Sequence, residues 1–120
     1  MKDFNKDVQT ARQGEVYFVR VKKLPDGVKN IEPVKGKFTI AHSETGHHHV
    51  MEAKENLKYF SSDDPLINYL QVVEATDEVE NLLVHLRGHD THDTVKFSPG
   101  VYCAITARES APEGWRRAAD

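Results

Sequence analysis

Hydrophobic and polar residues alternate along short segments of this chain, and turn-forming residues separate the segments. The clearest segment, 15–24, is rich in β-branched and aromatic residues and places Tyr17, Val19 and Val21 on one face. It runs into Pro25-Asp26-Gly27, in which each residue type favours a tight turn. This pattern predicts a strand followed by a turn.

Further segments of the same kind follow along the chain. We expect strands at 37–42, 47–53, 56–60, 66–75, 82–86, 95–97 and 101–108, and a short edge segment at 30–34. The apolar residues of 66–75 also fit one face of a helix, but its β-branched and aromatic residues favour a strand. Short strands without a clear amphipathic helix predict an all-β fold, either a small barrel or a sandwich.

The two ends of the chain differ from its middle. Residues 1–13 are polar with few apolar positions, so we expect a flexible N-terminal arm or one weak helical turn. A length of 120 residues suits one domain, which we place at 14–120. The C-terminal residues 112–120 predict a short turn or helix that Trp115 holds against the domain.

Composition narrows the classes of partner. The chain is 29% charged with a net charge of −3, and its lysines and arginines are scattered among acidic residues. The basic stripe typical of nucleic-acid binders is missing, which argues against that class. A polar N-terminus and the lack of an apolar stretch of bilayer length predict a cytoplasmic protein without a membrane segment.

Nucleophilic chemistry has little support. Cys103 is the one cysteine and lies in an apolar segment, where a small buried hydrophobic residue is expected. The sequence offers no cysteine pair for a zinc ribbon, no phosphate-binding glycine loop and no nucleophile elbow around a serine.

Histidine is the notable chemistry of the chain. Residues 41–52 contain four of the seven histidines and two carboxylates, Glu44 and Glu52. In a strand, His47 and His49 share one face while His48 points to the other.

Three more histidines follow some forty residues later. A turn would bring His89 and His92 together, whereas we interpret His85 as a core residue of a strand and His42 as a strand-end residue. We therefore predict a site for a divalent transition metal, namely zinc, iron, nickel or copper, with the ligands His47, His49, His89 and His92. Glu44 is the candidate acid, base or hydrogen-bond partner of a ligand. The competing interpretation is that these histidines are solvated or packed in the core.

Two resemblances add to this interpretation. The order of an His-x-His element, short strands and a Pro-Gly turn is similar to that of cupin barrels, which are metal-binding all-β proteins. The chain also resembles a family of small bacterial and phage-encoded proteins without a settled activity. That likeness is carried by Arg12-Gln13-Gly14-Glu15-Val16, Glu44-Thr45-Gly46-His47-His48-His49, His89-Asp90-Thr91-His92, Ser98-Pro99-Gly100-Val101-Tyr102, Arg108-Glu109 and 115–120. It implies a common fold and a histidine site at Glu44, His47, His49, His89 and His92.

We expect from the sequence a metal-binding small β-barrel protein of cupin-like or related type. The metal could serve an enzyme acting on a small-molecule ligand, as a Lewis acid or by activating water. The alternative is a non-enzymatic binding or assembly module, encoded by a phage or within an operon, without a metal. The sequence is compatible with a homo-oligomer.

Overall fold

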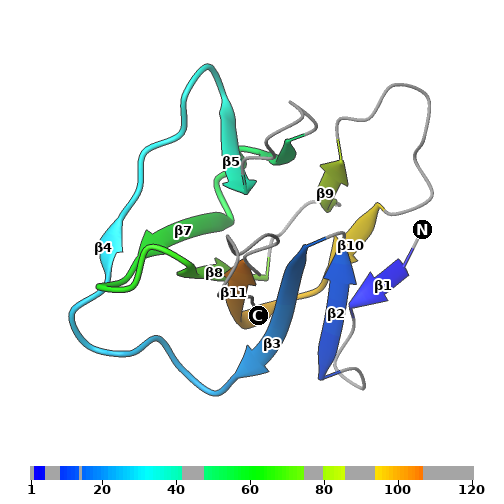
Figure 1. Cartoon of the computed structure of the whole chain (residues 1–120). Helices are drawn as coiled ribbons and strands as arrows, with labels where there is room; N and C mark the ends of the chain where they lie inside the picture. Colours follow the sequence, from blue (N-terminus) through cyan, green and yellow to red (C-terminus); the bar gives the residue numbers. More distant parts are fainter. Residues whose placement is uncertain are drawn as a thin grey trace, which may run out of the picture.

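The computed structural model describes residues 2–4, 9–13, 15–41, 48–74, 80–85 and 94–106 (Figure 1). All regular secondary structure in these residues is β-strand. The strands are β1 (Lys2–Phe4), β2 (Thr10–Gln13), β3 (Val16–Val21), β4 (Lys29–Asn30), β5 (Lys37–Ala41), β6 (His49–Glu52), β7 (Leu57–Ser61), β8 (Ile67–Val72), β9 (Asn81–His85), β10 (Val95–Phe97) and β11 (Gly100–Thr106).

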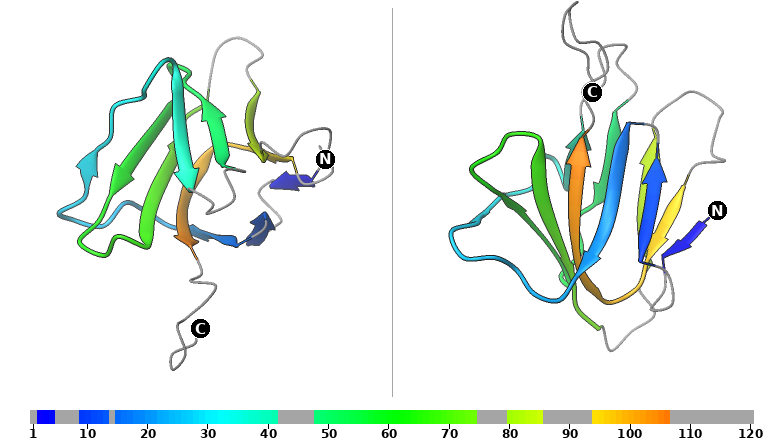
Figure 2. Two further views of the ribbon diagram at one scale, coloured as in Figure 1. Left: turned by 45° about the horizontal axis from the view of Figure 1, so that its top comes forward. Right: turned by 60° about the horizontal axis from the view of Figure 1, so that its bottom comes forward.

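The strands form two sheets that pack as layers of a sandwich. One sheet has the order β1-β10-β9-β6-β5 and the other has the order β2-β3-β11-β8-β7-β4. In the right-hand view of Figure 2, β8, β11 and β3 lie in front of strands of the five-stranded sheet. Neighbouring strands are antiparallel except β1, which pairs with β10 in parallel. The predicted all-β fold is confirmed, and of its two forms the structure is a sandwich, because the sheets do not close into a barrel.

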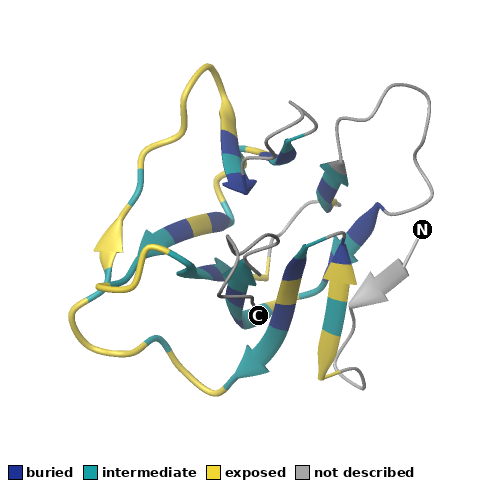
Figure 3. Ribbon diagram, viewed as in Figure 1, coloured by how far each residue is buried: buried dark blue, intermediate teal, exposed yellow. Residues whose placement is uncertain are grey.

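The core lies between the two sheets. Alternate residues of each strand are buried, which produces the dark blue stripes along β3, β5 and β7 in Figure 3. Phe97 of the five-stranded sheet makes edge-to-face contacts with Phe18 and Tyr102 of the six-stranded sheet, with ring centroids 5.1 Å and 5.0 Å apart. Such contacts stabilise the packing beyond the area they bury. The two layers are therefore joined by interlocking aromatic rings.

A buried tyrosine adds a polar connection between the sheets. Tyr59 of β7 donates a hydrogen bond to the carbonyl of Ile40 on β5 at 3.2 Å and accepts one from Asn68 at 2.7 Å. Burial raises the pKa of Tyr59 to about 12, more than the hydrogen bond from Asn68 lowers it. The neutral phenol is thus part of the folded core.

A pair of asparagines makes a second connection of this kind. Asn81, at the start of β9, is 3% exposed. Its side-chain amide exchanges hydrogen bonds with that of Asn56, at 2.9 Å and 3.2 Å. Asn56 also donates to the carbonyl of Val73 at 3.0 Å, beyond the end of β8. The exchange links the five-stranded sheet to the β7–β8 hairpin of the other layer.

The turn between β10 and β11 is closed by Arg20. Its guanidinium donates to the carbonyl of Pro99 at 3.2 Å and to Oγ of Ser98 at 3.3 Å, and it lies over the ring of Tyr102. Gly100 has a φ of +155°, and a Cβ at this position would clash with Nη1 of Arg20. A side chain at Gly100 would therefore displace the guanidinium of Arg20 and would sit on a backbone conformation that L residues rarely adopt.

Two expectations about secondary structure need correction. Thr10–Gln13 form β2 and pair with β3, and Lys2–Phe4 form β1, so these parts of the expected arm belong to the sheets. β2 is an edge strand, and edge strands often carry polar or charged side chains. Its polar sequence therefore did not indicate a strand. The expected edge segment 30–34 overlaps a strand only at Asn30, because β4 spans Lys29–Asn30. The turn or helix expected at 112–120 lies outside the described residues.

Candidate functional site

The end of the β2–β3 hairpin carries two of the side chains of the candidate site. Gln13 pairs with Val16 in the register of β2 and β3, so residues 14 and 15 alone connect the strands. Gln13 is 1% exposed, although it is the last residue of an edge strand. The hairpin thus places the side-chain amide of Gln13 in the core. Two residues later it places the carboxylate of Glu15 in a partly exposed position.

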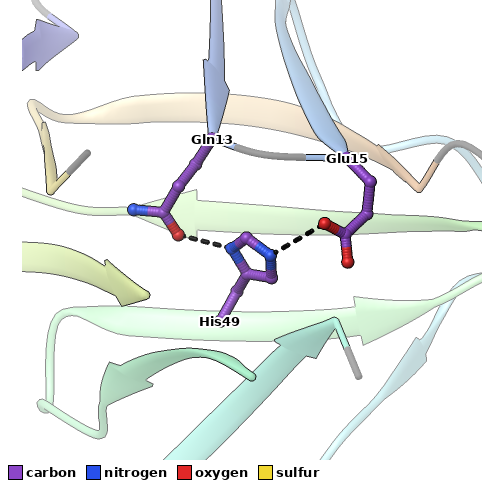
Figure 4. Close-up of polar contacts among 3 residues, drawn as sticks. All are labelled: Gln13, Glu15 and His49. Carbon is purple, nitrogen blue, oxygen red and sulfur yellow. Dashed lines mark hydrogen bonds and ion pairs between the residues drawn. The ribbon is translucent and has the colours of Figure 1, made fainter. Parts of the chain in front are cut away.

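His49 meets these two side chains from the opposite sheet. It is the first residue of β6 and is completely buried, with 0% exposure. Its Nδ1 lies 2.6 Å from Oε1 of Gln13, and its Nε2 lies 3.3 Å from Oε1 of Glu15 (Figure 4). One imidazole is held between two oxygen atoms that come from the other layer of the sandwich.

The orientation of Gln13 determines the protonation of His49. Nε2 of Gln13 donates to the backbone carbonyl of Leu83 at 3.0 Å, and a carbonyl can only accept. The amide oxygen therefore faces Nδ1 of His49, which must carry the proton and donate it. In a neutral imidazole, the lone pair is then on Nε2 and points toward Glu15.

Two arrangements satisfy the contact between Nε2 and the carboxylate. In the first, the imidazole is charged and donates to Glu15, but such charge-assisted hydrogen bonds are usually about 2.7–2.9 Å long. In the second, a cation lies between the two atoms. Two ligands of a tetrahedral zinc ion, each about 2.0–2.1 Å from the metal, are about 3.3 Å apart. The observed 3.3 Å is longer than the usual charge-assisted bond and is compatible with the second arrangement.

The pattern around His49 is also typical of metal-binding histidines. Such histidines commonly donate their second ring N–H to a carboxylate or carbonyl, which fixes the ring and its tautomer. The side-chain carbonyl of Gln13 has this position. Glu15 is partly exposed, with 19% of its side chain accessible, so the Nε2 side of the imidazole is the side closer to solvent.

The predicted ligands are only partly placed by the structure. His49 is described, whereas His47, His89, His92 and Glu44 lie outside the described residues. Within the described residues, no group of three or more metal-ligating side chains occurs.

Strand pairing connects both histidine-rich segments to the neighbourhood of His49. In the antiparallel pairing of β6 and β9, His49 is directly opposite His85. Segment 42–47 leads toward β6 at His49, and segment 86–93 leaves β9 at His85. The two segments that hold the predicted ligands are therefore attached to the sheet at one register position.

Gln13 and Glu15 were not predicted as site residues. The signal available in the sequence was Arg12-Gln13-Gly14-Glu15-Val16, which we used only as part of a family resemblance. A polar residue ending an edge strand does not reveal that it is buried. Only the packing of the two sheets shows that this hairpin faces His49.

Cys103 differs from the expected buried residue. It lies half-buried in β11, directly opposite Tyr69 of β8. Burial raises the pKa of its thiol, and a hydrogen bond with Tyr69 lowers it by less. The thiol form is favoured, which supports the view that Cys103 is not a nucleophile.

The fold and the site define a small β-sandwich domain with a buried histidine held between the sheets. A family model described as a domain of unknown function (DUF8820) matches residues 12–107, and the chain belongs to this family. The match includes Gln13, Glu15 and His49. Comparisons with curated proteins and with solved structures gave no match. The described residues include no helix with the length and apolar character needed to cross a membrane.

Proposed function

We propose that this protein binds a divalent transition metal between Nε2 of His49 and the carboxylate of Glu15. Gln13 fixes the tautomer that directs the Nε2 lone pair toward Glu15. The observation that carries the proposal is the set of contacts around His49. They combine an Nδ1 donor bond at 2.6 Å with a separation of 3.3 Å between Nε2 and the carboxylate.

Two side chains rarely hold a transition metal alone, so further ligands are part of the proposal. We assign them to the histidine-rich segments attached at His49, with His47, His89 and His92 as the candidates and Glu44 as acid or base. Strand pairing supports this assignment, because 42–47 and 86–93 lie next in sequence to strands that pair at His49 and His85. Zinc, iron, nickel and copper all accept such a set of imidazole and carboxylate ligands.

The chemistry of such a site would depend on its remaining coordination position. Three protein ligands and one open position would let the metal polarise a small-molecule ligand or activate water. Four protein ligands would make a structural site. The resemblance to cupin barrels contributes only the chemistry of an His-x-His element near a β-strand, because the two sheets here do not close into a barrel.

The test is elemental analysis of untagged protein, purified without chelator and then loaded with zinc or, anaerobically, with iron. We expect close to one metal per chain in the parent and a loss of metal in Glu15→Gln. Glu15 lies at a turn, so this variant should keep the fold, which circular dichroism checks. His48→Ala is the matched control and should retain the metal. A parent that takes up no metal, or a Glu15→Gln variant that keeps all of it, would overturn the proposal.

A second candidate function is that of a non-enzymatic binding or assembly module, encoded by a phage or within an operon. The observation that favours it is the apolar outer surface of the six-stranded sheet, described below. His49 itself is buried within the chain and is not available for a subunit contact. Metal-free protein that forms a defined complex would support this candidate over the first.

A further inference from the structure

The six-stranded sheet has an apolar surface on the side away from the core. Residues of β3, β11, β8 and β7 that alternate with the buried ones point outward. We call this set the outer face. Its members are Tyr17, Val19, Val21, Val101, Cys103, Ile105, Ile67, Tyr69 and Phe60. Eight of the nine are half-buried and Tyr17 is exposed, so each keeps part of its surface accessible.

Strand pairing shows that the outer face is continuous. Cys103 is directly opposite Val19 on one side and Tyr69 on the other, and Tyr69 is opposite Phe60. These four residues form a central row across the sheet, and Tyr17 lies in the row beside it. Tyr17 is 39% exposed. In the right-hand view of Figure 2, strands β8, β11 and β3 face the viewer.

Charge is confined to the borders of this face. No outward position of β3, β11 or β8 holds a charged residue. Arg12 stands on β2 and covers the ring of Tyr17 with its guanidinium 4.8 Å from the centroid, and Lys58 stands on β7. An uncharged centre with a polar border is the composition of a protein–protein interface.

We propose that the outer face binds a second copy of this chain face to face. The two-fold axis of this dimer lies between the two sheets and runs along the central row, perpendicular to the strands. The β7–β8 hairpin makes the face complementary to itself. Lys58 is opposite Gln71 near one end of the hairpin, and exposed Asp63 and Asp64 occupy its turn at the other end. The two-fold rotation brings Lys58 of each copy to the acidic turn of the other.

The size of the face suits such a dimer. The four strands of the outer face, together with β2 at its border, are spaced about 4.8 Å apart and average about six residues in length, so they cover roughly 500 Å². Two copies would bury roughly 1,000 Å², which is near the lower limit for a specific interface. The expected dimer is therefore weak, and its population should depend on protein concentration.

Cys103 provides a direct test in the unmodified protein. It lies in the central row, so the two-fold axis places Cys103 of one copy opposite the partner's Cys103. Stacked sheets are about 10 Å apart, which is too far for a disulfide, so the probe is a short bismaleimide crosslinker. We expect a covalent dimer at concentrations where sedimentation velocity detects the dimer. A protein that sediments as a monomer throughout and gives no crosslinked dimer would overturn the proposal.

Two variants separate this face from unspecific association. Val19→Glu places a charge in the central row. It should raise the dissociation constant of the dimer by about tenfold or more, so that the variant is monomeric where the parent is dimeric. Val34→Glu is the matched control, because Val34 is 71% exposed and lies outside the outer face. It should leave association unchanged. Circular dichroism establishes that both variants fold. Crosslinking that persists in folded Val19→Glu, or is lost equally in Val34→Glu, would show that another surface associates.

Discussion

The side-chain oxygen of Gln13 lies 2.6 Å from Nδ1 of His49, and this contact joins the edge strand of one sheet to an interior strand of the other. The same amide donates to the carbonyl of Leu83 on β9. Gln13 therefore satisfies two buried polar groups of the opposite layer at once. Both groups would lack a partner from β2 if this side chain were apolar.

We expect Gln13→Leu to weaken metal binding and to destabilise the fold. Loss of the group that orients a ligating histidine typically costs about 10–100-fold in affinity. Leaving buried donors and acceptors without their partner costs about 1–3 kcal/mol. Competition titration with a zinc chelator and thermal unfolding measure the two effects. Gln9→Leu, an exposed position next to the same strand, is the control and should change neither.

A metal site at His49 also predicts that ligand addition raises the melting temperature. A ligand that binds only the folded state stabilises it by about 2.7 kcal/mol at a hundred times its dissociation constant. Zinc should therefore raise the Tm of the parent and leave that of Glu15→Gln nearly unchanged. Equal shifts in both proteins would mean that zinc binds elsewhere.

Tyr59 predicts a loss of stability in alkaline solution. Its pKa is raised by burial from 10.0 to about 12 in the folded protein. Protonated Tyr59 therefore stabilises the folded state fully at a pH below 10, the pKa of tyrosine in the unfolded chain. This stabilisation is lost as the pH rises from about 10 through about 12. It amounts to about 2–3 kcal/mol.

The comparison with Tyr59→Phe isolates this contribution. The variant lacks the hydrogen bond to the carbonyl of Ile40 and should be about 1 kcal/mol less stable near neutral pH. Its stability should fall less steeply across the alkaline range. Urea unfolding at a series of pH values measures both. Parallel curves for the two proteins would show that other groups cause the alkaline loss.

Gly100→Ala should destabilise the protein by about 1–3 kcal/mol, because a φ of +155° strains a residue with a Cβ and because the new methyl group would displace the guanidinium of Arg20. Displacement removes the bonds of Arg20 to Pro99 and Ser98 and its stacking on Tyr102. In an Arg20→Ala background this part of the cost should disappear. A double-mutant cycle of unfolding free energies measures the coupling, and additive effects would contradict the explanation.

Asn81→Ala should cost about 1–3 kcal/mol, since it removes a buried amide whose partner Asn56 then loses two hydrogen bonds. Asn30→Ala is the control, because Asn30 is exposed on the edge strand β4. Thermal unfolding should separate the two variants clearly. Similar melting temperatures would show that water replaces the lost bonds in Asn81→Ala.

The alternation of apolar residues was enough to predict most strands and the all-β class. β3 and β11 were recognised by their composition instead, because β-branched and aromatic residues fill both of their faces. Alternation missed β2, in which Thr10, Arg12 and Gln13 read as a polar stretch. The choice between barrel and sandwich depends on how strands far apart in the sequence pair, which no local pattern contains.

Only part of the candidate site was predicted, because the site also depends on contacts between residues far apart in the sequence. His49 stood out because histidines are rare and it lies in a dense cluster. Gln13 and Glu15 are ordinary polar residues, 36 and 34 positions away from His49, and they became candidates only through the packing of the sheets. The other predicted ligands, His47, His89, His92 and Glu44, remain predictions.

The polar contact between β2 and β6 also restricts how the chain can misfold. If β2 slipped by one residue against β3, alternation would turn Gln13 to the opposite side of its sheet. Nδ1 of His49 and the carbonyl of Leu83 would then be buried without this partner, at a cost that apolar contacts alone would not impose. One glutamine near the end of an edge strand thereby selects the native alignment over its nearest competitor.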